Sequence, residues 1–203
     1  MDEVVRVEGL RRSFTSSLGF FRRRRMVVEA LKGLDFTIGR GEVFGLLGPN
    51  GAGKTTTVKI LSTMLVPTGG VAQVLGHDVD TGARLIRGRI NCVFGGERSL
   101  YWRLTGMENL RYFADLYRVP RAVQRGLLQR LMTLVGLEEH AHRRVEEYSR
   151  GMKQRLHIAR ALVNDPELVF LDEPTTGLDP AAARSVRNLV GGLKEMGKTI
   201  LLT

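Results

Sequence analysis

The chain has 203 residues, with 31 Lys and Arg against 21 Asp and Glu, a formal net charge of +10 and 43% hydrophobic residues. That apolar content excludes a disordered chain, and the length suits one domain with a core of its own. A single cysteine, Cys92, excludes a disulfide framework and a cysteine-based zinc site. The positive charge suggests nucleic acid or an anionic membrane surface, but it is spread along the chain, so a solvated arginine-rich surface is the simpler interpretation.

The N-terminal residues alternate between strand-like and irregular segments. Alternating side chains predict strands at residues 4–10 and 34–38, and the apolar run at 42–47 predicts a buried strand. Residues 15–28 break the alternation and are expected to form a loop with Phe20, Phe21 and four consecutive arginines from Arg22 to Arg25. Such a loop could contact lipid headgroups or a membrane partner, although a solvated loop is the simpler interpretation.

A glycine-rich phosphate-binding motif follows the apolar run. Residues 48–55 read GPNGAGKT and match G-x-x-x-x-G-K-[ST] between a predicted strand and a predicted helix at about 54–64. Such a turn directs backbone N–H groups and the positive end of the helix dipole toward phosphate oxygens, whereas a glycine-rich hairpin would not need the Lys-Thr pair. The lysine would reach the β- and γ-phosphates, and the two threonines would contact Mg²⁺ and the α-phosphate. The candidate nucleotide-binding residues are Gly48, Asn50, Gly51, Ala52, Gly53, Lys54, Thr55 and Thr56.

The middle of the chain is predicted to be mainly helical. Strands are expected at 71–75 and 90–94, and a helical pattern runs from about 100 to 162. Thr105 and Glu108 form a capping-box sequence before one amphipathic helix. Ser149 is a candidate N-cap of a later helix, whose first turn offers backbone N–H groups to an anion. On local pattern alone, this second turn is only a capped helix.

Two carboxylates follow the apolar run at 168–171. In a buried parallel strand, Asp172 would lie at the carboxyl end, where open α/β sheets bind their ligands. Asp172 would hold Mg²⁺, and Glu173 would polarise an attacking water. A solvated acidic turn is the alternative, but the phosphate-binding motif earlier in the chain favours the metal-binding and catalytic roles. Asp179 and Pro180 predict the start of a helix that ends near residue 196, before a strand at 199–203.

These motifs, in this order and spacing, resemble those of the ATP-binding cassette (ABC) ATPases. GPNGAGKT is similar to their Walker A motif, and LVFLDE at 168–173 to Walker B with its catalytic glutamate. YSRGM at 148–152 lies where the signature LSGGQ falls, and GLDP at 177–180 is similar to the D-loop. Residues 61–82 and 148–180 are most similar to ATPase subunits of ABC-2-type exporters.

The resemblance implies an α/β fold of the P-loop NTPase class. A mixed RecA-like core would carry an N-terminal antiparallel β-subdomain and an inserted α-helical subdomain. Residues 1–203 would form a single ABC ATPase domain that lacks its C-terminal end. The core with the β-subdomain would take about 1–99 and 163–203, and the helical subdomain with the signature about 100–162.

The resemblance also implies an ATP-hydrolysing transporter subunit, an exporter, on the cytoplasmic face of the cell membrane. ATP and Mg²⁺ would be its cofactors, with Thr55 and Asp172 at the metal and Glu173 catalytic. Two cassettes, identical or different, would dimerise head to tail around two ATP molecules and drive transmembrane permease subunits, and no nucleic acid is expected. Ser149 and Gly151 would contact the partner's ATP, and Asp179 of the D-loop would also be a nucleotide-binding residue.

Several positions depart from the family pattern. Phe14 is the candidate for the aromatic residue that stacks on adenine, with a core phenylalanine as the alternative. Gly95-Gly96-Glu97 stands where the family has the Q-loop glutamine; Glu97 could reach the metal or be a surface residue. Arg150 and Met152 replace the usual Gly and Gln of the signature. The family's switch histidine would lie beyond Thr203, so γ-phosphate sensing is expected to suffer, and we interpret the histidines present as surface or helix residues: His77, His140, His142 and His157.

Two alternative functions follow from these departures and from the charge. A non-transport ABC ATPase acting on nucleic acid or ribosomes is favoured by the charge of +10, but the chain has neither a long coiled-coil insertion nor a second cassette. A truncated ATP-binding module with impaired hydrolysis is favoured by the missing glutamine and histidine.

Overall fold

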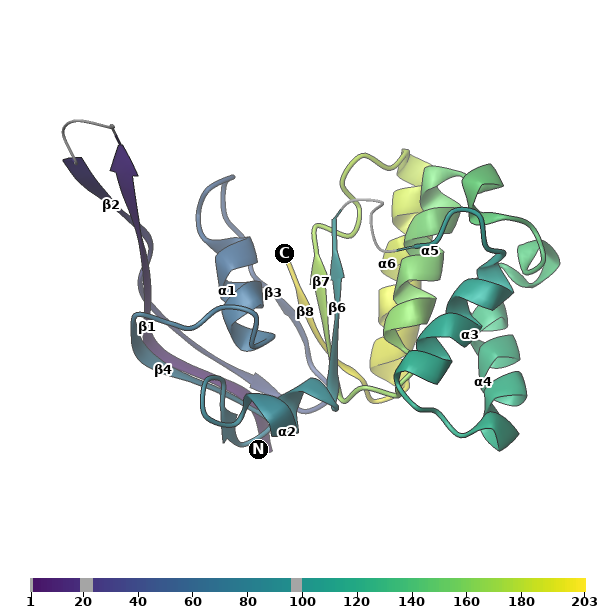
Figure 1. Cartoon of the computed structure of the whole chain (residues 1–203), viewed down its shortest axis with the longest axis horizontal. Helices are drawn as coiled ribbons and strands as arrows, with labels where there is room; N and C mark the ends of the chain where they lie inside the picture. The colour runs from purple at the N-terminus through teal and green to yellow at the C-terminus, as the bar shows by residue number, and fades with distance from the viewer. Residues whose placement is uncertain (1, 19–23, 96–99) are drawn as a thin grey trace.

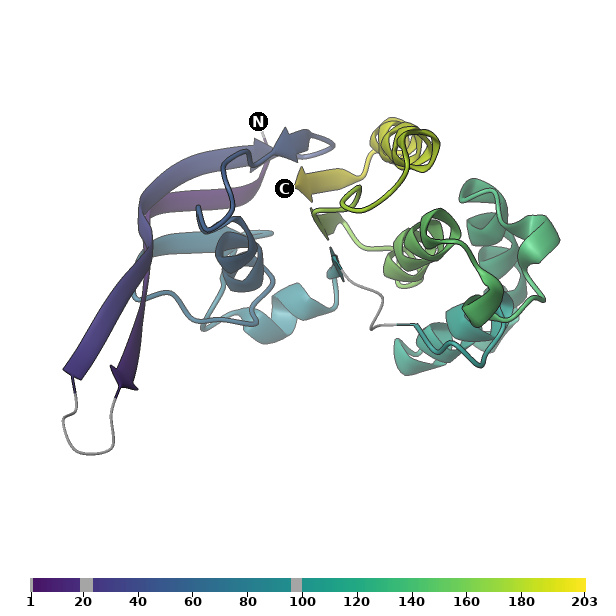
Figure 2. The ribbon, with the colours of Figure 1, turned by 90° about the horizontal axis from the view of Figure 1, so that it is seen from above.

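The computed structural model describes residues 2–18, 24–95 and 100–203, which form two β-sheets and a group of helices. Figure 1 shows the antiparallel strands at one end of the molecule, the helices of residues 106–161 at the other, and the parallel strands between them. Figure 2, seen from above, shows the same order.

The N-terminal sheet is antiparallel and contains β1 Glu3–Leu18, β2 Arg24–Gly39, β4 Gly69–Val74 and β5 His77–Asp78 in the order β2-β1-β4-β5. The loop predicted at 15–28 is wrong at both ends, because pairing continues to Leu18 opposite Arg24. In a two-stranded ribbon the strands satisfy each other's backbone groups, so neither face has to be buried and no alternation is needed. The predicted loop residues Phe20, Phe21, Arg22 and Arg23 lie outside the described residues.

The second sheet is parallel and contains β3 Val43–Gly45, β6 Ile90–Phe94, β7 Leu168–Asp172 and β8 Thr199–Leu202 in the order β3-β8-β7-β6. β7 is central and buried at every position, as its apolar run predicts. The strand predicted at 42–47 is shorter and less buried than expected, and Leu47 is 90% exposed. The reason is its position, because β3 lies at the edge of the sheet and has a neighbour on one side only.

Three helices begin at the polar caps that the sequence predicts. The Thr105 hydroxyl accepts from the Glu108 N–H, and the Glu108 carboxylate accepts from the Thr105 N–H, which confirms the capping box. Ser149 Oγ accepts from the Met152 N–H at 3.2 Å, and Asp179 Oδ1 accepts from Ala182. The helices are α1 Lys54–Leu61, α2 Ala83–Arg87, α3 Gly106–Leu116, α4 Arg121–Leu134, α5 Arg150–Ala161 and α6 Pro180–Glu195, with 3-10 turns at Glu138–His140 and Val145–Glu147.

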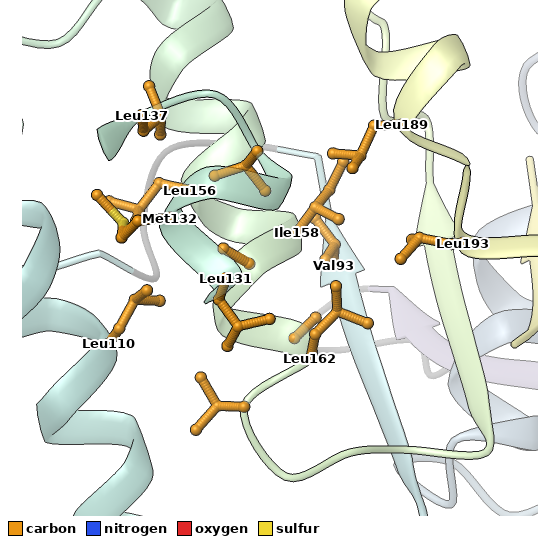
Figure 3. Close-up of a cluster of buried hydrophobic side chains, with 14 of the residues drawn as sticks. Val93, Leu110, Leu131, Met132, Leu137, Leu156, Ile158, Leu162, Leu189 and Leu193 are labelled. Atoms are coloured by element: carbon orange, nitrogen blue, oxygen red, sulfur yellow. The ribbon is translucent and has the colours of Figure 1, made fainter. Parts of the chain in front are cut away.

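Two apolar clusters hold these layers together. The first joins α3, α4, α5 and α6 to the parallel sheet, and Figure 3 shows side chains such as Val93 of β6 and Ile158 of α5 pointing into it. The second packs α1 between the two sheets, with Val58 and Ile60 of α1 buried together with Phe170 of β7. The fold therefore places the start of α1 at the junction of both sheets.

A small ion network closes the end of the parallel sheet opposite its carboxyl edge. Glu167 precedes β7, and its carboxylate accepts from Arg89 Nε at 2.5 Å and from Arg40 Nη1 at 2.9 Å. These two guanidinium groups lower the pKa of Glu167 to about 2. The network ties the chain before β7 to the segments that precede β3 and β6.

A Glu167→Gln variant should be less stable than the wild type at neutral pH, and this difference in stability should shrink in acid. Because the folded-state pKa lies below the ordinary value of 4.5, the carboxylate stabilises the fold above about pH 4.5, and this contribution is lost as the pH falls toward 2. The ion pairs are partly exposed, so we expect a loss of about 1 kcal/mol at pH 7. Urea unfolding between pH 7 and pH 2.5 measures it, with the exposed Glu195→Gln as the charge-matched control. A stability gap that stays constant across this range would contradict the prediction.

Candidate active site

The glycine-rich motif forms the turn between β3 and α1, as predicted. Gly51 and Gly53 have φ angles of +84° and +89°, in the left-handed region that favours glycine. A Cβ on Gly53 would also lie 2.5 Å from Leu31 Cδ2 and 2.6 Å from the Ala30 carbonyl oxygen of β2. Gly53 is therefore required both by its backbone angle and by the close approach of the turn to the antiparallel sheet.

The lysine of the motif lies inside its own turn. Lys54 Nζ donates to the carbonyl oxygens of Gly48 and Pro49, at 2.7 and 3.1 Å. Gly48 is tightly packed as well, because a Cβ there would lie 3.0 Å from the Cβ of Ala52. An ammonium group held by neutral carbonyls can exchange them for phosphate oxygens, which carry negative charge.

The phosphate-binding turn and the acidic strand end share one cavity. This cavity of about 280 Å³ lies at the N-terminus of α1, where backbone N–H groups without intrahelical partners favour an anion. Glu173 reaches it from the end of β7. The residues that line it are Ala30, Asn50, Gly51, Gly53, Lys54, Thr55, Thr56 and Glu173.

The backbone turns sharply at the two carboxylates. Asp172 ends β7 and is 6% exposed, and its Oδ1 accepts from Thr203 Oγ1 at 2.6 Å. The Glu173 N–H donates to the same hydroxyl at 3.0 Å, and Glu173 has a φ of +50°, which is costly for a residue with a Cβ. The Glu173 carboxylate accepts from Thr176 Oγ1 at 3.3 Å. The strained turn is thus fixed by hydroxyl groups on both sides.

The donors at this site fit a hard divalent cation. The Thr55 hydroxyl and the Glu173 carboxylate line the cavity, and Asp172 is the preceding residue on β7. Oxygen donors of this kind suit Mg²⁺, which keeps several waters and is commonly shared with substrate phosphates.

The signature residues lie in a second group, outside that cavity. Ser149 caps α5, and a Cβ on Gly151 would lie 2.7 Å from the Cβ of Ala182 in the first turn of α6. Asp179 caps the same turn of α6. The structure therefore brings Ser149, Gly151 and Asp179 together and does not bring them to the phosphate-binding turn of the same chain.

The remaining predicted residues have different outcomes. Phe14 is 41% exposed, with the Arg12 guanidinium 4.7 Å from its ring centroid, and it does not line the cavity. Gly96 and Glu97 lie outside the described residues. His157 is a helix residue, as interpreted, but it is buried, and this burial lowers the pKa of its imidazole to about 4.

Two residues at the site were missed by the sequence analysis. Ala30 of β2 forms one wall of the cavity, and Thr203 holds both Asp172 and Glu173. Nothing in the local sequence marks Ala30. Thr203 could be found only from the register of β7 and β8, in which Leu171 lies opposite Leu202.

Among the described residues, none of the helices has the length and apolar character that crossing a bilayer requires.

Comparison with known proteins identifies the family. A family model for "ABC transporter" matches residues 31–176. The fluoroquinolones export ATP-binding protein of Mycobacterium tuberculosis (strain CDC 1551 / Oshkosh) is 45% identical over 201 residues, and the match covers 99% of this chain but only 62% of that protein. The structure of cbiO1 from Clostridium perfringens, part of the ABC transporter complex cbiONQ, has a TM-score of 0.84 at 28% identity, covering 100% of this chain and 78% of that one. A dimeric post-hydrolysis state of the ATP-binding cassette MJ0796 bound to ADP and Pi has a TM-score of 0.80 at 27% identity, covering 98% and 86%. With this match across the phosphate-binding turn, the signature turn and both carboxylates, the chain belongs to the ABC transporter family.

Proposed function

We propose that this chain is the ATP-binding and ATP-hydrolysing subunit of an ABC exporter, peripheral on the cytoplasmic face of the cell membrane. The cavity that Lys54 and Thr55 share with Glu173 carries the proposal, because it places a phosphate-binding turn and a carboxylate at one site. The relative named for fluoroquinolone export supports the assignment to exporters.

In this proposal the turn binds the triphosphate through its backbone N–H groups and through Lys54. The lysine gives up the carbonyl oxygens of Gly48 and Pro49 for phosphate oxygens. Thr55 and Asp172 would hold Mg²⁺, which supplies neutralisation of phosphate charge when bound. Glu173 would orient the attacking water and polarise it. In this proposal the adenine ring stacks on the side chain of Phe14.

The separation of the signature turn from the cavity supports a head-to-tail dimer. Ser149 and Gly151 lie at the start of α5, outside the cavity, and Ser149 is exposed there, so in this proposal the turn closes on the nucleotide of a second cassette. The MJ0796 cassette is described as a dimer with ADP and Pi, which supports the same arrangement here. The proposal treats residues 1–203 as one cassette, with about 100–162 as its helical subdomain and about 1–99 with 163–203 as its core.

An apolar surface beside β6 supports a permease partner. A cavity of about 890 Å³ lies along this strand, and Met64 and Tyr117 are exposed at its lining. Leu116 is 60% exposed next to Tyr117. Exposed apolar side chains gathered at a cavity are typical of a protein interface. The cbiO1 protein is described as part of a transporter complex, which supports a permease as the occupant.

A Lys54→Ala variant should bind Mg·ATP at least about tenfold more weakly, because it removes charge-assisted hydrogen bonds to the phosphates. Lys59→Ala is the matched control, since Lys59 is an exposed lysine of the same helix, outside the cavity. Isothermal titration of both variants measures the affinity. Equal affinity of Lys54→Ala and wild type would overturn the assignment of this site.

A Glu173→Gln variant of the complete protein should accumulate as an ATP-bound dimer, because nucleotide still binds but the water is no longer polarised. Light scattering after size exclusion in Mg·ATP measures the mass of the complex. The double variant Lys54→Ala, Glu173→Gln should stay monomeric under the same conditions. A monomeric Glu173→Gln variant at saturating ATP would count against the dimer mechanism.

A further inference from the structure

The open edge of β6 is covered by side chains instead of a strand. In the described part of the chain β6 pairs only with β7, so its outer backbone groups have no sheet partner. At Cys92 both outer groups are satisfied, since the N–H donates to Asn91 Oδ1 at 2.9 Å and the carbonyl accepts from Arg160 Nη2 at 2.9 Å.

The helical part of the chain supplies most of this cover. Arg160 is in the last turn of α5, and its guanidinium lies 5.0 Å from the ring centroid of Phe113 in α3. Asn91 Nδ2 donates to Asn164 Oδ1 at 2.9 Å, and the Tyr117 hydroxyl donates to Asn91 Oδ1 at 3.4 Å. We call Asn91, Tyr117, Arg160 and Asn164 the β6 clasp.

Placing the Arg160 guanidinium here costs more desolvation free energy than a purely structural role requires. None of the ion pairs among the described residues involves it, and its Nε is buried without a hydrogen-bond partner there. Partial burial lowers the pKa of its guanidinium, as expected for a cation that has lost part of its contact with water. An apolar side chain would pack at this place without that desolvation cost.

The helix that carries Arg160 also carries the signature turn. Ser149 caps the start of α5 and Arg160 lies in its last turn, so one rigid element of roughly 15 Å joins the two. On the other side of the clasp, β6 continues to Phe94, which lies opposite Asp172 of β7. A Cβ on Gly95 would lie 3.5 Å from the Asp172 carbonyl oxygen. The clasp therefore lies between the signature turn and the strand end that carries the carboxylates.

We propose that Arg160 is a positioning residue, which couples the orientation of α5 and its signature turn to the strand beside Asp172 through the Cys92 carbonyl. The apolar cluster around Val93 and Ile158 is non-directional and does not fix the angle between helix and strand, whereas the hydrogen bond does. The consequence of this coupling for turnover rests on the proposed function.

The chain contains its own reporter for the clasp. Cys92 is the single cysteine, is 9% exposed and lines the large cavity with Asn91, Tyr117 and Arg160. Burial raises the pKa of its thiol to about 12, so it should react slowly while the clasp is closed. A change in the clasp would therefore change the rate of modification by N-ethylmaleimide.

The test compares Arg160→Met with Arg155→Met. Arg155 is on the same helix and also donates to carbonyls, those of Val135 and Gly136, but both belong to the helical part. For Arg160→Met we expect kcat for ATP hydrolysis to fall about tenfold, because one hydrogen bond to a charged group is lost. KM for ATP should change by less than about twofold, because Arg160 does not line the cavity that Lys54 and Glu173 share. Arg155→Met should lower thermal stability without this loss of kcat.

The labelling experiment gives a readout besides turnover. In the wild type, Mg·ATP should change the rate at which N-ethylmaleimide modifies Cys92. In Arg160→Met the rate should rise about tenfold, by loss of the same hydrogen bond, and no longer respond to Mg·ATP. Arg160→Lys keeps the charge but not the planar guanidinium group. It replaces Arg160→Met in this test if the Met variant does not fold. Equal kcat in the Arg160 and Arg155 variants, or an intact ATP response in the Arg160 variant, would overturn the proposal.

Failure of the clasp is distinguishable from failure of the proposed function. Glu173→Gln with an intact clasp tests the dimer alone. If it dimerises and the dimer of Arg160→Met, Glu173→Gln dissociates at an about tenfold higher protein concentration in saturating ATP, the clasp proposal is supported. If the two dimers have the same dissociation constant in saturating ATP, only the clasp proposal fails; if Glu173→Gln does not dimerise, the proposed function fails.

Discussion

The contact between Gly53 and β2 is the constraint on which the site depends. The phosphate-binding turn touches the Ala30 carbonyl and Leu31 so closely that no side chain fits at Gly53. The helix that follows is packed between the two sheets, with Val58 and Ile60 fully buried. The turn is therefore held from two directions, by the antiparallel sheet on one side and by the core under α1 on the other. A phosphate-binding turn whose N–H groups are already fixed loses little conformational entropy when an anion binds.

The parallel register supplies the second half of the site. β7 lies between β6 and β8, so the ends of all three strands lie at the same edge of the sheet. This register brings the Thr203 hydroxyl to Asp172 and to the strained backbone at Glu173. The positive φ at Glu173 is sustained by these hydrogen bonds, and it directs the carboxylate into the cavity of the turn. Neither half of the site would be positioned without the core that α1 and β7 share.

The local features of this fold were predictable, and the distant contacts were not. The phosphate-binding motif is one continuous segment at 48–55, and the caps at Thr105, Ser149 and Asp179 accept from residues three positions along the chain, so both are local, and the structure confirms where they lie. The strand segments at 15–18 and 24–28 and the exposed edge at β3 were mispredicted, because pairing and edge position are decided by other strands. Ala30 and Thr203 were missed for the same reason, since each acts on residues more than twenty positions away.

The excess of positive charge has a structural origin that composition does not reveal. Several cations donate to neutral carbonyl oxygens and not to carboxylates: Arg12 to Val66, Arg87 to Thr63, Arg155 to Val135, Arg160 to Cys92 and Lys54 to Gly48. A guanidinium group can bind a carbonyl at the end of a strand or helix and still keep its charge, because the partner contributes none. Each such contact adds order to a loop or strand edge and leaves one positive charge uncompensated. A chain that secures its backbone in this way becomes basic, so part of its charge records how its loops and strand edges are held.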